Sequence, residues 1–233
     1  MASRAPAGLL KARLPLASGL SLQLLAAALV TVPVFLQAPW VRIAPMQAAL
    51  FTIPLAAAAI LLEQHGNQRW RSIGALLMGF CGSWLGGTLF WGWCRLHPVW
   101  HLPLEGLALP LAVAGLASRW RLAGTFYLAS FAGTALTDLA MLSTGIMPLW
   151  PEVLQAPIPE APLLLQGAAR QVLRPNSLVV VLTLAGALVG VCRMLWRRSE
   201  TGRLAAVTLA TTLVVDGLFL ALALLAPCFS GLI

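Results

Sequence analysis

The sequence predicts an all-α, polytopic helical membrane protein with about seven transmembrane helices and a cytoplasmic N-terminus. Of its 233 residues, 60% are hydrophobic and only 9% are charged, and the mean hydropathy is +0.88. Water-soluble domains carry roughly a quarter charged residues, so these few charges cannot cover a soluble surface of this size. Lipid is therefore the expected solvent, and we expect one transmembrane domain over residues 1–233.

Seven apolar stretches approach the roughly 20 residues that a spanning helix needs. They cover residues 15–36, 46–62, 73–93, 102–118, 122–142, 177–196 and 204–226. Backbone polar groups in lipid must be satisfied internally, and the alternating pattern of barrel strands is absent, so each stretch is predicted to be a helix. The second and fourth stretches are short and contain Pro54 and Pro110, which predicts kinks or tilts there.

The basic residues predict the orientation of the chain. Most of the 15 Lys and Arg residues fall on one predicted side, at 4, 11 and 13 in the tail 1–14, then at 69, 71, 119, 121, 193, 197, 198 and 203. Only Arg42, Arg95, Arg170 and Arg174 fall on the other side. The positive-inside rule places the richer side in the cytoplasm. The net charge of +8 is spread between apolar runs, which indicates topology and not a nucleic-acid partner.

Tryptophans mark both predicted interfaces independently of the arginines. Trp70, Trp120 and Trp196 each neighbour an arginine on the inner side, whereas residues 40, 91, 93, 100 and 150 are tryptophans gathered on the outer side. Such aromatic belts are typical of the two headgroup regions of a bilayer. The two independent signals therefore predict the same topology.

The longest predicted connection is the outer loop 143–176, and its second half has a helical pattern. Apolar residues recur at 164, 168 and 172 and at 165, 169 and 173, whereas Gln166, Arg170 and Arg174 form a polar stripe. This amphipathic pattern favours a short helix lying in the headgroups. A lid over an outward-facing pocket is the alternative.

Ionisable residues at membrane depth are the strongest functional signal in so apolar a chain, because they are costly there and usually face a cavity or a partner. Asp216 lies near the centre of the seventh predicted span, Asp138 toward the outer end of the fifth, and Glu105 near the outer end of the fourth. We expect Asp216 to be hydrogen-bonded to a hydroxyl such as that of Ser83 or Thr212. It is either a neutral contact between helices or a proton or cation site.

The segment 94–105 is the densest polar stretch of the chain. His97, His101 and Glu105 follow at four-residue spacing, so on a continuous helix they would share one face and could bind a metal or haem, with Asp138 arriving from another helix. Pro98 argues against a continuous helix there, which leaves the metal prediction open beside plain interfacial polarity. Arg42 joins these residues at the predicted outer face.

Two cysteines, Cys94 and Cys228, are also expected near the outer face, where a disulfide would require an oxidising compartment.

Three segments resemble an uncharacterised cyanobacterial family of integral-membrane proteins, named only as a domain of unknown function. They are residues 34–42 (VFLQAPWVR), 97–105 (HPVWHLPLE) and 133–138 (GTALTD), and the similarity extends from about Leu20 onward. The resemblance implies a multi-pass protein of the cyanobacterial inner or thylakoid membrane. It assigns no activity, so it implies no catalytic residues and no cofactor.

Three functions remain open. The first is transport or capture of a small solute or ion through an outward-facing polar site built from Arg42, His97, His101, Glu105 and Asp138, with Asp216 deeper. The second, which draws on the resemblance, is a pigment- or metal-binding assembly factor with a photosynthetic membrane complex as partner. The third is a membrane-embedded metal-dependent enzyme, which ranks last because no catalytic motif is present.

Overall fold

The computed structural model describes residues 16–229, and every regular element in that part of the chain is helical. The longer helices are α1 (Leu16–Val32), α4 (Thr52–His65), α5 (Gln68–Leu89), α8 (Arg121–Ser143), α10 (Ala161–Val172), α11 (Pro175–Arg198) and α12 (Glu200–Leu225). Short α-helices are α2 (Ala38–Ile43), α3 (Pro45–Leu50), α6 (His101–Glu105), α7 (Leu109–Gly115) and α9 (Trp150–Gln155). Two π-helices, η1 (Pro33–Gln37) and η2 (Phe90–Cys94), and three 3₁₀ turns, η3 (Pro98–Trp100), η4 (Met147–Leu149) and η5 (Pro227–Phe229), complete the set. The all-α fold class is therefore confirmed.

Six helices in the described part of the chain are long and apolar enough to cross a membrane. They are Ser21–Ile43, Pro45–His65, Gln68–Cys94, Arg121–Ser143, Pro175–Arg198 and Glu200–Leu225. Each overlaps one of the seven predicted stretches. They fit a multi-pass protein in a lipid bilayer.

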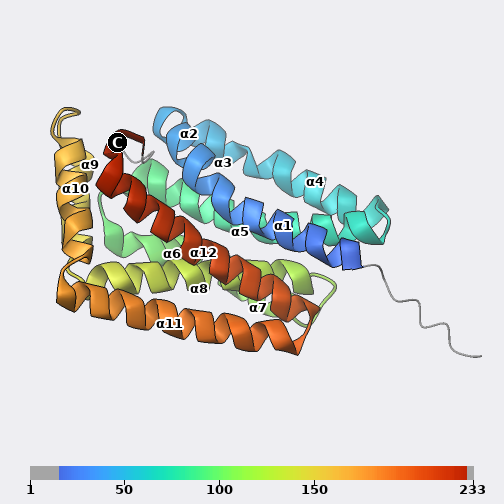
Figure 1. Cartoon of the computed structure of the whole chain (residues 1–233). Coiled ribbons are helices and arrows are strands. Elements are labelled where there is room, and N and C mark those ends of the chain that lie inside the picture. The colour runs from blue at the N-terminus through green and yellow to red at the C-terminus, as the bar shows by residue number, and fades with distance from the viewer. Residues whose placement is uncertain (1–15, 230–233) are drawn as a thin grey trace, which may run out of the picture.

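The fourth predicted span, 102–118, differs from the expectation of one helix. It consists of α6 and α7, separated by a turn at residues 106–108. Gly106 ends α6, and Pro110 lies in the first turn of α7, where its missing N–H costs no hydrogen bond. Together the two pieces connect the end of α5 to the start of α8, so this segment runs the length of the bundle as a broken helix (Figure 1).

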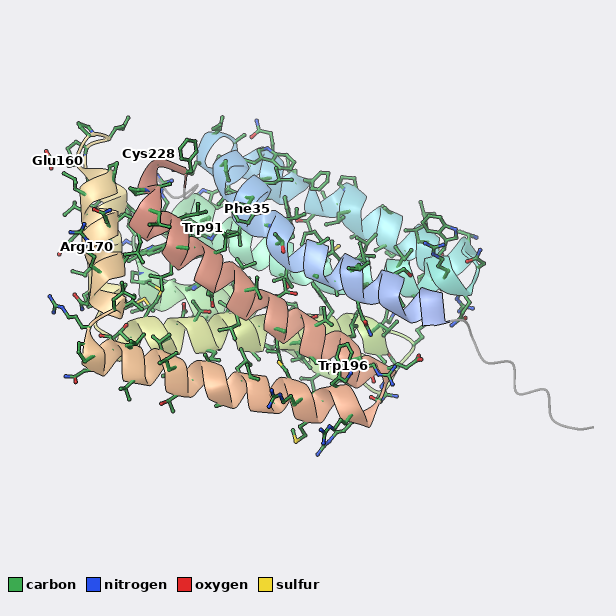
Figure 2. The ribbon with its side chains drawn as sticks, in the orientation of Figure 1. Phe35, Trp91, Glu160, Arg170, Trp196 and Cys228 are labelled. Atoms are coloured by element: carbon green, nitrogen blue, oxygen red, sulfur yellow. The ribbon has the colours of Figure 1, made fainter. Side chains whose placement is uncertain are left out.

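The helix ends gather at two faces of the bundle (Figure 1). We call one the arginine-rich face; it contains the connections 66–67 and 116–120 and Ser199. Glu63 forms ion pairs that link three segments at this face. Its carboxylate lies 3.7 Å from the guanidinium of Arg71 and 3.5 Å from that of Arg119. The other, which we call the distal face, contains residue 44 and the connections 95–100 and 144–174. Trp196 and Trp91 lie toward these two different ends (Figure 2).

Local sequence explains where several helices begin. The Asn67 side chain accepts hydrogen bonds from the backbone N–H groups of Arg69 and Trp70 and so caps α5. The Ser199 hydroxyl accepts from the N–H of Gly202 in the same way at α12. A proline occupies the first turn of α10 and of α11. Ser199 lies between α11 and α12, so its cap is located at the sharp turn on the arginine-rich face.

Helix α5 lies at the centre of the main core. Its residues Leu76, Phe80 and Trp84 pack with Phe126 of α8 and Ala26 of α1, all nearly inaccessible to solvent. A Cβ added at Gly86, on the same helix, would lie 2.8 Å from the Cα atom of Glu105, so only glycine permits α6 to approach this closely. The core thus fixes the position of the broken fourth segment.

The long connection on the distal face folds into α9 and α10. Helix α10 runs across the ends of the long helices, and Arg170 and the preceding Glu160 lie at its outer edge (Figures 1 and 2). Its predicted apolar stripe is buried in part, because Leu165 and Ala169 pack with Ala223 of α12, whereas Leu173 stays 49% exposed. The Gln166 amide donates to the carbonyl oxygen of Leu224 at 2.7 Å. Helix α10 therefore packs against the end of α12.

Candidate functional site

A cavity of about 260 Å³ runs from the distal face toward the middle of the bundle. Its lining includes Pro98 and Trp150 at that face, and Ser130 and Thr212 near the midpoints of α8 and α12. Four of the predicted site residues line it: His101, Glu105, Asp138 and Asp216. The fourth, fifth and seventh predicted spans therefore meet at one cavity.

His101 lies between two carboxylates from two helices. Its Nδ1 is 2.9 Å from Oδ1 and 3.0 Å from Oδ2 of Asp138 on α8, and its Nε2 is 3.3 Å from Oε1 of Glu105, one turn further along α6. The imidazolium form, which carries a proton on each ring nitrogen, donates to both carboxylates. The ring centroid of Phe90 lies 4.3 Å from that of His101 and fixes one face of the imidazole.

Asp216 accepts a hydrogen bond from the same stretch of α8 that contacts His101. The Thr137 hydroxyl, next to Asp138 in sequence, donates to Oδ2 of Asp216 at 2.6 Å. The hydroxyl partner expected from the sequence was that of Ser83 or Thr212, and both of these line the cavity without making this bond. Two adjacent residues of α8 thus connect the polar groups of α6 with the carboxylate of α12.

Tyr127 stabilises the break in the fourth segment, which borders this site. Its hydroxyl donates to the carbonyl oxygen of Glu105 and accepts from the N–H of Ala108 at 3.2 Å. These are backbone groups at the two ends of the turn between α6 and α7. Non-helical backbone at membrane depth requires such partners, because lipid supplies none. Tyr127 is itself buried on α8.

Both π-helices of residues 16–229 border the cavity. Pro33, Gln37 and Phe90 come from them and contribute to the lining. The buried Gln37 amide donates to the carbonyl oxygen of Trp84 at 2.6 Å and to the Thr88 hydroxyl at 2.5 Å, which anchors η1 to α5. Single-turn π-helices are often found at functional sites.

Two predicted site residues lie elsewhere. The His97 side chain is exposed in the turn before η3, and Arg42 is exposed at the end of α2; neither lines the cavity. His97 thus does not join His101 and Glu105, because Pro98 interrupts the helix that would have aligned them. Within residues 16–229 no group of three or more His, Cys, Asp and Glu side chains is arranged to hold a metal ion. Cys94 and Cys228 carry free thiols.

Sequence reasoning missed the uncharged members of the site. Thr137 and Tyr127 are polar residues within an apolar stretch and Gln37 directly follows one, and threonine and glutamine commonly bond their own helix or a neighbour there. Tyr127 carried a usable signal, since it is the single tyrosine of the chain and lies inside a predicted span. Glu63, at the arginine-rich face, is 3% exposed and paired with two arginines, and nothing in the sequence singled it out.

The cavity combines three carboxyl groups with one imidazole, and no Lys or Arg of residues 16–229 lines it. Such a site can bind a cation or transfer protons between carboxyl groups and the imidazole.

Comparison with known proteins gives a family and no activity. No curated protein and no solved structure matches the chain. A family model with the description "Protein of unknown function (DUF3120)" matches residues 26–224, which include every cavity residue named above. The match confirms the resemblance drawn from the three segments, while the cyanobacterial membrane stays a prediction. The chain belongs to this DUF3120 family.

Proposed function

We propose that the protein captures a small cation in the cavity at the distal face, or moves it across the bilayer. The observation behind the proposal is that Glu105, Asp138 and Asp216, from three different helices, line one cavity with His101 as the single basic group. A cation entering this cavity would compensate the excess negative charge of the carboxylates. The positive-inside rule, applied to the arginine-rich face, predicts that the cavity opens away from the cytoplasm.

Two further features support a binding role. The fourth segment is broken next to the carboxylates, and discontinuous helices in transporters commonly form the binding site near the bilayer midplane. The rings of Phe90, Trp91 and Trp150 line the same cavity. Aromatic faces attract organic cations at about 0.5–2 kcal/mol each.

Binding and uptake of two probes, methylammonium and tetramethylammonium, test the proposal on the full chain in liposomes. We expect Asp138→Asn and Asp216→Asn each to reduce binding of the better probe at least about tenfold, because each removes a charge from the cavity. Glu160→Gln is the matched control, since Glu160 is an exposed acid before α10 and does not line the cavity. Absence of binding to wild type, or equal binding by wild type and both Asn variants, overturns the proposal.

The assembly-factor and enzyme hypotheses stay predictions from the sequence. The assembly-factor hypothesis drew on the pair His97 and His101, and the exposed position of His97 gives that pair no added support.

A further inference from the structure

A second cavity, of about 250 Å³, lies beside the first and differs from it in chemistry. Residues of α8, α10, α11 and α12 form most of its lining, and η4, α9 and the turn before them contribute the rest near the distal face. Its lining is dominated by aliphatic side chains such as Leu136, Leu165, Leu188 and Leu220. Residues of α10 line it at the distal face, and the apolar space extends from there along α8, α11 and α12.

The two cavities share a wall. Thr137, Met141, Trp150, Thr212, Asp216 and Phe219 line both of them. The hydrogen bond from Thr137 to Asp216 therefore lies at the boundary, with polar groups on one side and aliphatic groups on the other. One layer of side chains separates a carboxylate-rich space from an apolar one.

Their sizes suggest that they act together. Ligand pockets usually measure about 300–1,000 Å³. Each cavity alone lies slightly below that range, at about 260 and 250 Å³, whereas the pair falls within it. Met141 and Phe219 in the shared wall have side chains that can change rotamer to join the spaces.

We propose that the two cavities form one site for an amphiphilic cation, with an ammonium head beside Asp138 and Asp216 and a single hydrocarbon tail between α8, α11 and α12. The inference rests on the proposed function and adds the substrate class to it. The carboxylates select the charge of the head, and the aliphatic lining of the second cavity accommodates the tail.

The second cavity, which we call the tail compartment, can be filled by substitution at residues that do not line the first cavity. A Cβ added at Gly217 meets no atom within 4 Å, and this residue lines the second cavity but not the first. A Cβ at residue 217 therefore has open space around it, and Gly217→Leu adds an aliphatic side chain to the lining of the second cavity. Gly190→Leu is the matched control, because a Cβ there also meets nothing within 4 Å and the residue lines neither cavity. Ala185→Leu fills the same space from α11.

The experiment compares decyltrimethylammonium with tetramethylammonium on the full chain in nanodiscs. The decyl chain also partitions into lipid, so each variant is compared with wild type for the same probe, which cancels the partitioning. We expect Gly217→Leu and Ala185→Leu to weaken decyltrimethylammonium binding at least about tenfold. Tetramethylammonium binding should stay within about twofold, and Gly190→Leu should change neither.

The outcomes separate this inference from the proposed function. If both filling variants bind decyltrimethylammonium like wild type, or wild type binds only tetramethylammonium, the tail compartment is refuted while cation capture stands. If a filling variant that still elutes as a folded particle binds neither probe, a separate tail compartment is also refuted. Failure of wild type to bind either probe refutes the proposed function itself.

Discussion

His101 is the one basic side chain among three acidic ones in the cavity, and its two nitrogens face carboxylates from α6 and α8. The side chains of His101, Glu105 and Asp138 are only 10–19% exposed to solvent, so water screens their charges weakly. Removing the imidazole leaves two carboxylates near each other without a cation. Such loss of one partner in a buried cluster is strongly destabilising.

We therefore predict that His101→Gln lowers the free energy of unfolding by about 3 kcal/mol. The double variant His101→Gln with Asp138→Asn should recover part of that loss, because it also removes one of the two unpaired charges. Denaturant unfolding of the purified chain in detergent measures all four members of this cycle. An interaction free energy below about 0.5 kcal/mol between the two substitutions would contradict a direct pair.

The acidic members of the cavity could be predicted at this scale, since an ionisable residue in an apolar stretch is conspicuous. Asp138 and Asp216 were identified by that rule alone. Their partners could not be predicted. Which hydroxyl bonds Asp216 depends on how α8 and α12 are rotated against each other, and the sequence holds no signal that prefers Thr137 over Thr212.

At the scale of elements, the broken fourth segment has the most effect on the site. Prolines in the stretch 102–118 indicated a distortion, but they did not locate it. The turn at 106–108 depends on partners from other helices, namely the Tyr127 hydroxyl and the close approach of α5 at Gly86. Most other helix bounds agree with the predicted stretches to within a few residues, because apolar length and caps are local properties.

Gly86→Ala tests the contact between α5 and α6. The new Cβ would lie 2.8 Å from the Glu105 Cα and 2.9 Å from the Leu104 carbonyl oxygen, both backbone atoms that cannot rotate away. We expect a loss of about 1–3 kcal/mol in the free energy of unfolding, as for other overpacked positions. Gly190→Ala, where the Cβ meets no neighbour within 4 Å, should be neutral or slightly stabilising. Equal stability of the two variants would show that α6 can move away at no cost.

At the scale of the whole molecule, the two faces differ in what holds them together. The arginine-rich face has Glu63 paired with Arg71 and Arg119, which links the ends of α4 and α5 to the connection before α8. The distal face has the cavity and α10. The grouping of helix ends follows from the number and order of spans, which the sequence predicts well. The burial of Glu63 cannot be predicted in this way, because the Glu63 carboxylate pairs with Arg119, which is distant in sequence.

Cysteine labelling tests which face lies in the cytoplasm. Cys228 is exposed after α12, at the distal face, so in a Cys94→Ser chain a membrane-impermeant maleimide should label it from outside intact cells. With Cys228→Ser added, a Gln64→Cys substitution on the arginine-rich face should be labelled only after the membrane is permeabilised. The reverse pattern would invert the topology and direct the cavity toward the cytoplasm.

Tyr127 carries one more consequence. Because the chain contains a single tyrosine, a ring-labelled sample yields one aromatic spin system, and it reports on the junction between α6 and α7. Any motion that separates those two pieces must break a bond to that phenol. The native chain thus contains its own spectroscopic reporter for movement beside the cavity, with no dye or engineered label.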